Sequence, residues 1–556
     1  MPASCSMSFT LHDALTLANR TTRVLRVLLH KVSSLVPSVD FGTVLHASLR
    51  TPDSIATPSS TMSQLKKRSV AVSFIFQLPK DDTTNTRPKV ALFKRSDKVR
   101  TYQHKYAPVS GSIESFDADP LATAWREIQE ETTLTPCSLT LFRRGKPYSF
   151  VDESIQREWT INPFGFILTS DPSKITIDWE HDGYAWFDPA DVADGQKVDG
   201  VPKLLESLRR VWLEFDLGPA ATVLDAGLTR LKGDHESGAR QLAGTALGTF
   251  SDVLKKLDFS DKEVWWANAR RAGWHLWKNG RESMGAPILS VVLAGLDVVR
   301  EKASRGLSAD VVSDIAASLD ELARQREASA SGVANTFAAF LQRYPADRPV
   351  RILTLSSSST ITSCLTHALA SVGHGLDLRI LESRPLCEGA KLAYKLSSFA
   401  AEHDFSSRVH VTVMTDAAAG IASQDVDLLL LGADLIDRHG NVSNKTGSLP
   451  AVLAARHISS HVKVVVVSEK EKVLPFEAPG HEDNDAGEVT RGWDSVGVAR
   501  GQGPGGDVKV RNVYFEWVDN GLVDVYVTDE GVSGTEDVMR WAGDIERRAK
   551  DVFDGL

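Results

Sequence analysis

The sequence has few cysteines, no long apolar run and no surplus of basic residues. Its four cysteines, Cys5, Cys137, Cys364 and Cys387, lie far apart in the chain and form no CxxC motif. This spacing excludes a disulfide scaffold and a structural zinc site, and it favours a reducing intracellular compartment. No apolar run reaches the length of about 18 residues that a membrane-spanning helix needs. Lys and Arg total 63 against 72 Asp and Glu, a net charge of −9, which argues against direct binding of nucleic-acid phosphates.

The chain is long enough for several domains. Its 556 residues, 42% of them hydrophobic and 24% charged, can form roughly three or four cores of about 150 residues each. Composition and periodicity predict a multidomain protein with five segments. They are a disordered tail or targeting segment at 1–66, an α+β domain at 67–216, a linker at 217–233, a helical subdomain at 234–345 and a parallel α/β sheet domain at 346–556.

The first sixty residues differ in composition from the rest. Residues 1–61 contain three Asp, no Glu, several basic residues and frequent Ser, which is typical of a mitochondrial transit peptide. A disordered tail, or a start codon placed too early, explains the same composition, since Met62 opens MSQLKKRSVAV directly before the first predicted strand. The tail favours a cytoplasmic protein, and the transit peptide a mitochondrial one.

The remainder of the chain changes its periodicity twice. A hairpin is predicted from the two apolar segments SVAVSFIFQL and VALFKRS, which flank a polar turn. Further strands are predicted at TINPFGFIL and GYAWF, and a helix is predicted near 203–215. Residues 237–343 are helical in pattern. After them, helical segments alternate with six predicted strands, which are VRILTL, DLRILES, VHVTVMT, DLLLLGADL, VKVVVVS and VDVYVT. Continuous apolar strands between helices predict a parallel sheet covered on both faces.

One predicted helix carries an unusual group of acids. Asp119 is a suitable N-cap for it, and Pro120 suits its first position. Glu127, Glu130 and Glu131 then fall at i, i+3 and i+4, so three carboxylates share one face. Such carboxylates repel one another unless a cation lies among them. Hard divalent ions are bound by carboxylates together with phosphate oxygens, and they activate water.

The stretch REIQEETTL, with a glycine upstream, resembles the signature of Nudix hydrolases. KVRTYQHKYAPVSGSIE before it and EHDGYAWFDPADV after it are similar to flanking segments of that family, so the resemblance covers about 150 residues. It implies that Glu127, Glu130 and Glu131 are ligands of Mg²⁺ or Mn²⁺ and that Arg126 holds a glutamate in place. The implied reaction is attack of water on a diphosphate joined to another group.

Two features depart from that signature. Thr133 stands at the family's glycine near the helix end, where a left-handed backbone is unfavourable for a β-branched residue. Gly111 lies one residue too far from Arg126, and the family's first glutamate falls on Ala118. Glu180 is a further candidate ligand or base, with a surface acid as the alternative.

The second half resembles a different family. Five segments follow the order of that family's motifs over about residues 234–550. They are MGAPILSVVLAGLDVV, ILTLSSSSTI, ESRPLCEGAKLA, LLLGADLIDRHGNVSNKTGSLPAVLAA and VRNVYFEWV. The family contains the α, β and δ subunits of translation initiation factor 2B. It also contains the aldose–ketose isomerases of methylthioribose 1-phosphate and ribose 1,5-bisphosphate. The resemblance implies a helical subdomain, a Rossmann-like sheet and association into a homo-oligomer through the C-terminal domain.

A ligand site is expected at the carboxyl ends of the predicted parallel strands. Ser356 lies in a serine loop between a strand and a helix, which suits a phosphate. Arg384 supplies a forked cation, and Asp434, Asn444 and Lys445 follow the apolar strand LLLLGAD. The alternatives are an ion pair for Arg384, a helix cap for Asp434 and a polar loop for the serines.

Two substitutions bear on isomerase activity. The family's catalytic cysteine falls on about Ser356, whose hydroxyl is a much weaker acid than a thiol, and Cys364 lies inside the next helix. The arginine of the family's RGAP motif is Met284, with Arg281 nearby but out of register. Three hypotheses remain: a Nudix hydrolase fused to a sugar-phosphate-binding or regulatory domain, a sugar-phosphate isomerase, and a non-catalytic regulatory subunit.

Overall fold

The structure is a computed structural model that describes residues 65–79, 87–234, 237–281, 284–304, 306–476, 480, 483–496 and 509–556. The chain divides into two compact units, Met1–Gln64 and Leu65–Leu556, and the second is described below. The expected tail or targeting segment lies outside the described residues except for its last two positions. Within the described part, no helix combines the length and apolarity needed to cross a membrane.

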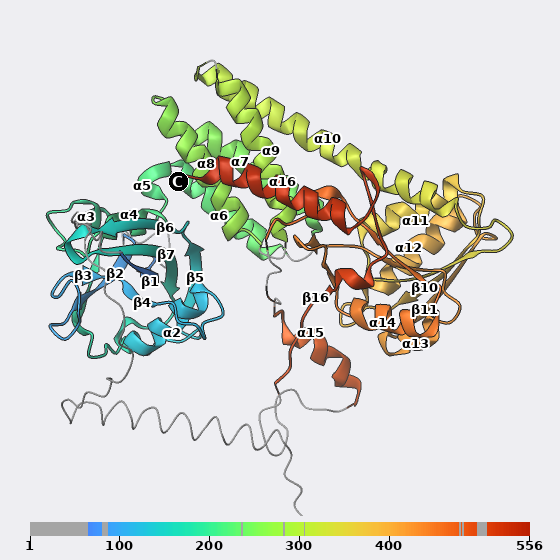
Figure 1. Ribbon diagram of the computed structural model, residues 1–556, viewed down its shortest axis with the longest axis horizontal. Coiled ribbons are helices and arrows are strands. Elements are labelled where there is room, and N and C mark those ends of the chain that lie inside the picture. Colours follow the sequence, from blue (N-terminus) through green and yellow to red (C-terminus); the bar gives the residue numbers. More distant parts are fainter. Residues whose placement is uncertain are drawn as a thin grey trace, which may run out of the picture. The chain divides into compact units, whose positions relative to one another are not determined.

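The first half of this unit contains an eight-stranded mixed sheet (Figure 1). Strand β1 (Lys66–Gln77) lies at its centre, antiparallel to β2 (Lys89–Arg95) and β4 (Val109–Ser112) and parallel to β7 (Arg157–Leu168). The hairpin of β1 and β2 was predicted. The other strands are β3 (Tyr106–Ala107) and β8 (His181–Phe187) beside β2, and β5 (Leu139–Arg144) and β6 (Tyr148–Asp152) beside β7.

Both faces of this sheet are covered because β1 is apolar on both sides. Ala71 and Ile75 belong to a core with helix α2 (Pro120–Thr132). Phe74 and Phe76 belong to a second core, on which α3 (Pro189–Ala193) and α4 (Leu204–Arg209) pack. The result is the expected α+β arrangement.

The segment after the sheet is helical. The helix expected near 203–215 is two short helices, α4 and α5 (Glu214–Leu217), and between them the carbonyl of Val211 accepts a hydrogen bond from Arg143 at 2.9 Å. The expected linker at 217–233, for which some helical character was predicted, contains helix α6 (Ala220–Gly233). Its Leu224, Leu228 and Leu231 are buried because this spacing forms one apolar stripe.

Four long helices follow, as the periodicity predicted. They are α7 (Ala239–Lys256), α8 (Lys262–Asn279), α9 (Gly285–Ala303) and α10 (Ala309–Leu341). Their apolar faces share one core with α6, with the last helix α16 (Thr535–Phe553) and with one face of the next sheet.

That sheet has seven strands in the order β11 (Val409–Met414), β10 (Leu376–Leu381), β9 (Val350–Leu355), β12 (Leu428–Leu431), β15 (Lys463–Val467), β17 (Val525–Thr528) and β18 (Gly531–Ser533). All neighbouring pairs are parallel except β17–β18. Helices α11 (Ser359–Ser371), α12 (Glu388–Glu402), α13 (Ala419–Ala422) and α14 (Ser448–Ile458) connect the strands. The chain leaves β9 in one direction across the sheet and continues from β12 in the other, so these two strands form the switch point at which open α/β sheets bind ligands.

A small sheet beside these strands was not predicted. It contains β13 (Leu435–Ile436), β14 (Val442–Lys445) and β16 (Phe515–Val518). The first of these strands has only two residues, and the third lies some seventy positions further along the chain, so no local pattern identified them.

Candidate active site

Helix α2 positions the acidic residues of the first half. The Asp119 side chain accepts a hydrogen bond from Ala122 N at 2.7 Å, and Pro120 is the first helical residue, as predicted. Ala124 and Ile128 are fully buried against the sheet. These contacts fix which face of the helix carries the glutamates.

The three glutamates lie at different depths. The side chain of Glu130 is 59% exposed, Glu127 is half-buried and Glu131 is 3% exposed. Glu131 accepts a hydrogen bond from Ser110 N at 3.3 Å, and its other oxygen lies 3.4 Å from Nε2 of the buried His181. Sequence reasoning missed His181, although it belongs to the EHDGYAWF segment that supported the family resemblance.

Arg126 connects the more exposed acids. Its guanidinium lies 2.6 Å from Glu127, 3.2 Å from Glu130 and 2.9 Å from Asp117, and it also donates to Ser112 O at 3.1 Å. The predicted contact with Glu130 is therefore present. These hydrogen bonds hold the pKa of the Asp117 carboxyl well below its usual range.

The acidic cluster contains more negative charge than its cations neutralise. Burial, reinforced by the charges of Glu127, Glu180 and Asp178, raises the pKa of Glu131 well above its usual value. Burial also raises the pKa of Glu127 and Glu180, and it lowers that of His181, which disfavours its positive form. Crowded hard oxygen donors of this kind suit Mg²⁺ or Mn²⁺ in their chemistry. As the side chains lie, no three Asp, Glu, His or Cys groups among the described residues converge into a ready metal site.

Gly111 and Thr133 both have special geometry. A Cβ atom on Gly111 would lie 1.9 Å from the Glu127 carboxyl group, so a larger residue there would displace the Glu127 side chain from this position. Thr133 ends the helix with φ 60° and ψ 3°, and its N–H donates to Gln129 O at 3.0 Å. The left-handed conformation expected at this position is therefore adopted by a β-branched residue.

A cavity of about 710 Å³ opens beside Glu127 and Glu180. Six basic residues line it: Lys66, Arg68, Arg95, Lys98, Arg100 and Arg157. Five aromatic residues also line it: Tyr102, Tyr148, Phe150, Trp159 and Trp179. Sequence reasoning did not single these residues out, because they come from several strands and loops outside the helix signature. Cations suit phosphate groups, and aromatic rings suit a flat ring system.

In the second half, several predicted residues meet at the switch point. Ser356 follows β9 with φ 71°, and its N–H donates to Ser383 Oγ at 2.7 Å. A Cβ atom on Gly432 would lie 3.2 Å from Ser358 Oγ and 3.5 Å from Asn444 Oδ1. The serine loop, the end of β12 and β14 are thus in close contact.

Charged residues surround Asp434 in this region. Burial raises the pKa of Asp434, whereas the charges of Lys472, Lys445 and Arg281 lower it. Lys445 lies 2.8 Å from Glu388. The buried Lys472 donates to Ala433 O at 2.7 Å, and sequence reasoning missed it because SEKEK looks like surface charge.

The remaining predicted residues are placed differently. Arg384 makes no hydrogen bond or ion pair to Asp434, Asn444 or Lys445, and its guanidinium lies so close to Gly492 that a Cβ there would be 2.3 Å from Nη2. Met284 is buried before α9. Cys364 is buried in α11, where burial raises the pKa of its thiol, so it does not replace the family cysteine.

Comparison with known proteins identifies two regions. A model of the Initiation factor 2 subunit family matches residues 235–535, more than half of the chain, and a NUDIX domain model matches residues 69–208. Methylthioribose-1-phosphate isomerases of Heliobacterium modesticaldum and Albidiferax ferrireducens are each 30% identical, over 201 and 199 residues. These matches cover 32% of this chain and 53% and 52% of the relatives, so the chain spans about half the length of the curated relatives it matches.

Solved structures found to be similar include translation initiation factor eIF-2B of Pyrococcus horikoshii, with 22% identity and a TM-score of 0.38 over 57% of this chain and 96% of that one. The 5-methylthioribose 1-phosphate isomerase of the same organism has 19% identity and a TM-score of 0.41, over 59% of this chain and 87% of that one.

Proposed function

The chain belongs to the Initiation factor 2 subunit family and carries a NUDIX domain ahead of the matched region, and from this premise we propose that its first half hydrolyses a diphosphate-linked substrate. The reaction requires Mg²⁺ or Mn²⁺, and the substrate is a phosphorylated small molecule of the nucleoside diphosphate type. The observation that carries the proposal is the crowded carboxylate cluster of α2 beside a cavity lined by cations and aromatic rings.

Glu127, Glu130 and Glu131 are the residues that would hold the ion, with Glu180 close by. When bound, a divalent cation polarises phosphoryl oxygens and lowers the pKa of a water molecule. The surplus of negative charge around Glu131 supports this assignment, because buried carboxylates that repel one another are stabilised by a cation.

The other residues of the site have roles that their positions support. Arg126 orients Glu127 and Glu130 through direct hydrogen bonds. The basic residues of the cavity, such as Arg95 and Arg157, attract and orient the phosphate groups. Trp159 and Trp179 offer ring faces for the group joined to the diphosphate.

Binding of Mn²⁺ to the full chain, measured by electron paramagnetic resonance, tests the metal assignment without any substrate. We expect Glu131→Gln to weaken binding at least about tenfold, since removal of a single metal-supporting group costs that much or more. Glu153→Gln is the matched control and keeps the wild-type affinity, because Glu153 is an exposed acid in the short turn directly after strand β6. Equal affinity in both variants would contradict the assignment.

A second function is supported by the surroundings of Asp434. The Asp434 carboxylate at the switch point is surrounded by the positive charges of Lys445, Lys472 and Arg281. A site with these charges suits a sugar phosphate. We propose that Ser356, Arg384, Asp434, Asn444 and Lys445 contribute to such a site. The isomerase relatives raise the alternative that it is catalytic, whereas Ser356 and Met284 favour binding alone.

Conversion of methylthioribose 1-phosphate to its ketose distinguishes the two alternatives. An isomerase shows conversion that Asp434→Asn abolishes. A binding or regulatory module shows no conversion but retains saturable binding of the same compound. Absence of both would contradict a sugar-phosphate site.

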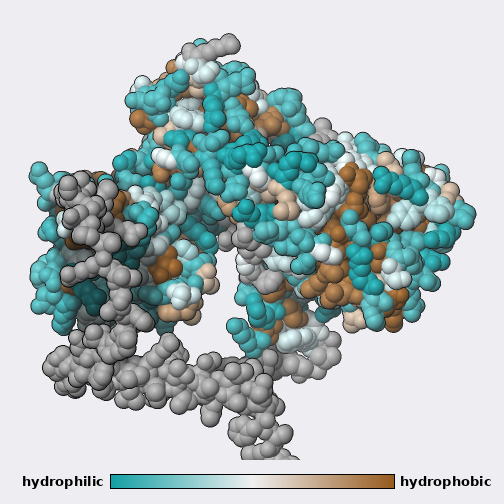
Figure 2. All heavy atoms as spheres, viewed as in Figure 1, coloured by the Kyte–Doolittle hydropathy of each residue, from teal (hydrophilic) through white to brown (hydrophobic). Residues whose placement is uncertain are grey.

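We further propose that the second half assembles into a homo-oligomer. Figure 2 shows hydrophobic residues gathered on the part of the chain that carries the seven-stranded sheet. Helices α12, α13 and α14 carry four exposed large side chains, Tyr394, Ile421, Leu453 and Ile458. Groups of exposed apolar side chains are typical of a protein interface. In this proposal residues 234–345 form a helical subdomain and residues 346–556 a Rossmann-like domain.

A further inference from the structure

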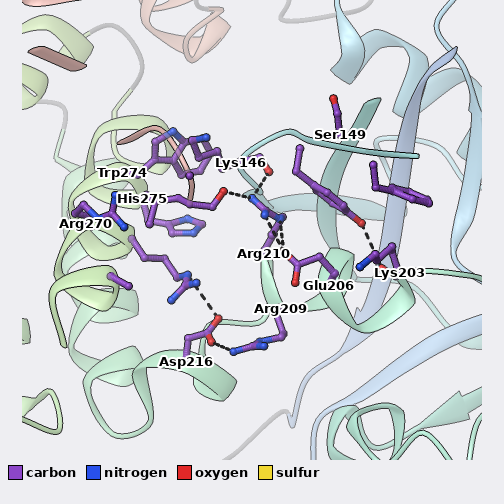
Figure 3. Close-up of a pocket in the computed structure, with 16 residues that line it drawn as sticks. Lys146, Ser149, Lys203, Glu206, Arg209, Arg210, Asp216, Arg270, Trp274 and His275 are labelled. Carbon is purple, nitrogen blue, oxygen red and sulfur yellow. Dashed lines mark hydrogen bonds and ion pairs between the residues drawn. The ribbon is translucent and has the colours of Figure 1, made fainter. Parts of the chain in front are cut away.

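A second cavity, separate from the site above, contains an unusual concentration of positive charge. It has a volume of about 470 Å³ and lies between β6 and α4 on one side and α8 on the other (Figure 3). Two acidic side chains line it, Glu206 and Asp216, and so does Leu556, whose carbonyl oxygen accepts a hydrogen bond from Arg210 at 3.1 Å. Six basic residues line it: Lys146, Lys203, Arg209, Arg210, Arg270 and Arg271.

The two carboxylates are already engaged. Glu206 accepts from the guanidinium of Arg210 at 2.7 and 3.1 Å. Asp216 is shared by Arg209, which donates to one oxygen, and Arg271, whose Nε lies 3.5 Å from the other. Three basic residues therefore remain without a carboxylate partner in the described structure.

The remaining three have few partners of any kind. The ammonium groups of Lys146 and Lys203 make no hydrogen bond or ion pair with the described residues. Arg270 donates Nη1 to the carbonyls of Val552 and Asp554 at 3.2 Å, whereas its buried Nε has no partner. A buried donor without an acceptor is unfavourable.

Repulsion among these cations is visible at Lys146. Burial lowers the pKa of its ammonium group, and the charges of Arg210 and Arg270 lower it further, whereas the charge of Asp554 raises it. Burial also lowers the pKa of Arg271, where the charges of Arg209 and Arg210 act in the same direction and that of Asp216 opposes them. Positive charges concentrated in a partly enclosed cavity create a strong potential for anions.

From the cavity and its three basic residues without a carboxylate partner, we propose that this is an effector site for a small polyanion with two or more phosphate groups. The ligand bridges Lys146 and Lys203 on the NUDIX side to Arg270 on α8. Inorganic pyrophosphate and a nucleoside diphosphate share this chemistry. Binding at this site does not depend on hydrolysis in the other cavity.

Strand β6 provides a route between the two cavities. Tyr148 and Phe150 line both of them. The Arg210 guanidinium lies 4.4 Å from the centre of the Tyr148 ring, and the Tyr148 hydroxyl lies 2.8 Å from Ser207 Oγ. The Tyr148 hydroxyl also lies 3.3 Å from the carbonyl oxygen of Lys203, so a polyanion that binds Lys203 acts beside a wall of the substrate cavity.

Calorimetric titration of the full chain with inorganic pyrophosphate, in the absence of metal, tests the proposal. We expect Lys146→Gln and Lys203→Asn each to weaken binding about tenfold, equivalent to about 1.4 kcal/mol. Asparagine suits position 203 because Lys203 has φ 62°. Arg100→Gln removes an exposed cation of the larger cavity and therefore reports on binding in that cavity. Lys255→Gln, at an exposed residue of helix α7 that lines neither cavity, is the control and leaves this binding unchanged.

Parallel titration with ADP distinguishes the two sources of phosphate. Tighter binding of ADP than of pyrophosphate, with the same dependence on Lys146, identifies a nucleotide effector. Equal affinities identify the phosphate groups alone. Absence of saturable binding by thermally stable wild-type protein, or a loss confined to Arg100→Gln, would overturn the proposal.

Discussion

The Glu131 carboxylate lies 3.4 Å from Nε2 of His181, and both side chains are almost completely buried. Glu131 comes from helix α2 and His181 from the first position of strand β8, which pairs with β2, so the pair joins the helix to a different part of the NUDIX sheet from the strands β1, β4 and β7. His181 Nδ1 lies 3.5 Å from Asp178, which places the ring between two acids. His181 is therefore a positioning residue for the carboxylate cluster.

We expect His181→Leu to lower Mg²⁺ affinity about 10- to 100-fold, the usual cost of removing a group that orients a metal ligand. The measurement is the Mg²⁺ concentration that gives half-maximal turnover. His181→Gln restores a polar nitrogen near Glu131 and should recover part of the affinity. A structural role alone would instead lower the melting temperature of both variants and leave the Mg²⁺ dependence unchanged.

Arg126→Lys should reduce turnover about 10- to 100-fold while the fold is retained. A lysine cannot contact Asp117, Glu127 and Glu130 at once, because it lacks the planar fork of arginine. Steady-state kinetics at saturating Mg²⁺ measure the effect. Arg87→Lys, at an exposed ion pair with Asp188, is the control, and equal turnover in both variants would contradict the role of Arg126.

Thr133→Gly should stabilise the protein by about 0.5–1 kcal/mol, because glycine adopts a left-handed backbone without strain. Thr133 is exposed, so little packing is lost. Thermal unfolding measures the gain. Thr133→Ala keeps the unfavourable φ and should show none, whereas an equal gain in both variants would point to the side chain rather than the backbone.

Ile421→Asp should convert the expected homo-oligomer to a monomer, because a charge in an apolar interface is poorly solvated. Light scattering at micromolar concentration measures the mass. Val264→Asp, at an exposed position on helix α8, is the control and leaves the mass unchanged. A monomeric wild-type protein would contradict the assembly.

Local signals explain what could be predicted from the sequence. Helix α2 has its cap, its first proline and its i, i+3, i+4 glutamates within one short segment, so Asp119, Pro120 and Glu127 helped to identify it. The strands of the parallel sheet are continuous apolar runs, and Val350–Leu355 matches the predicted VRILTL. The family resemblances rested on such local segments and are confirmed by the matched regions.

The rest depends on contacts between distant segments. The burial of Glu131 follows from Ser110 on β4 and His181 on β8, which no spacing within α2 reveals. Lys472 lies in a short turn after β15, and only the fold places it beside Asp434. Helix α6 was predicted only as a linker with some helical character, because it lacks the side-chain cap that helped to identify α2.

Release of phosphate from a panel of nucleoside diphosphates, nucleotide sugars and dinucleotides, with and without Mg²⁺, tests the central claim most directly. The full chain and its Glu130→Gln and Glu131→Gln variants are compared, with circular dichroism to verify folding. We expect Mg²⁺-dependent release by the wild type and a loss of at least about 100-fold in each variant, since each removes a proposed ligand. Full activity in both folded variants, or no release from any compound, would contradict the assignment of this site as a hydrolase.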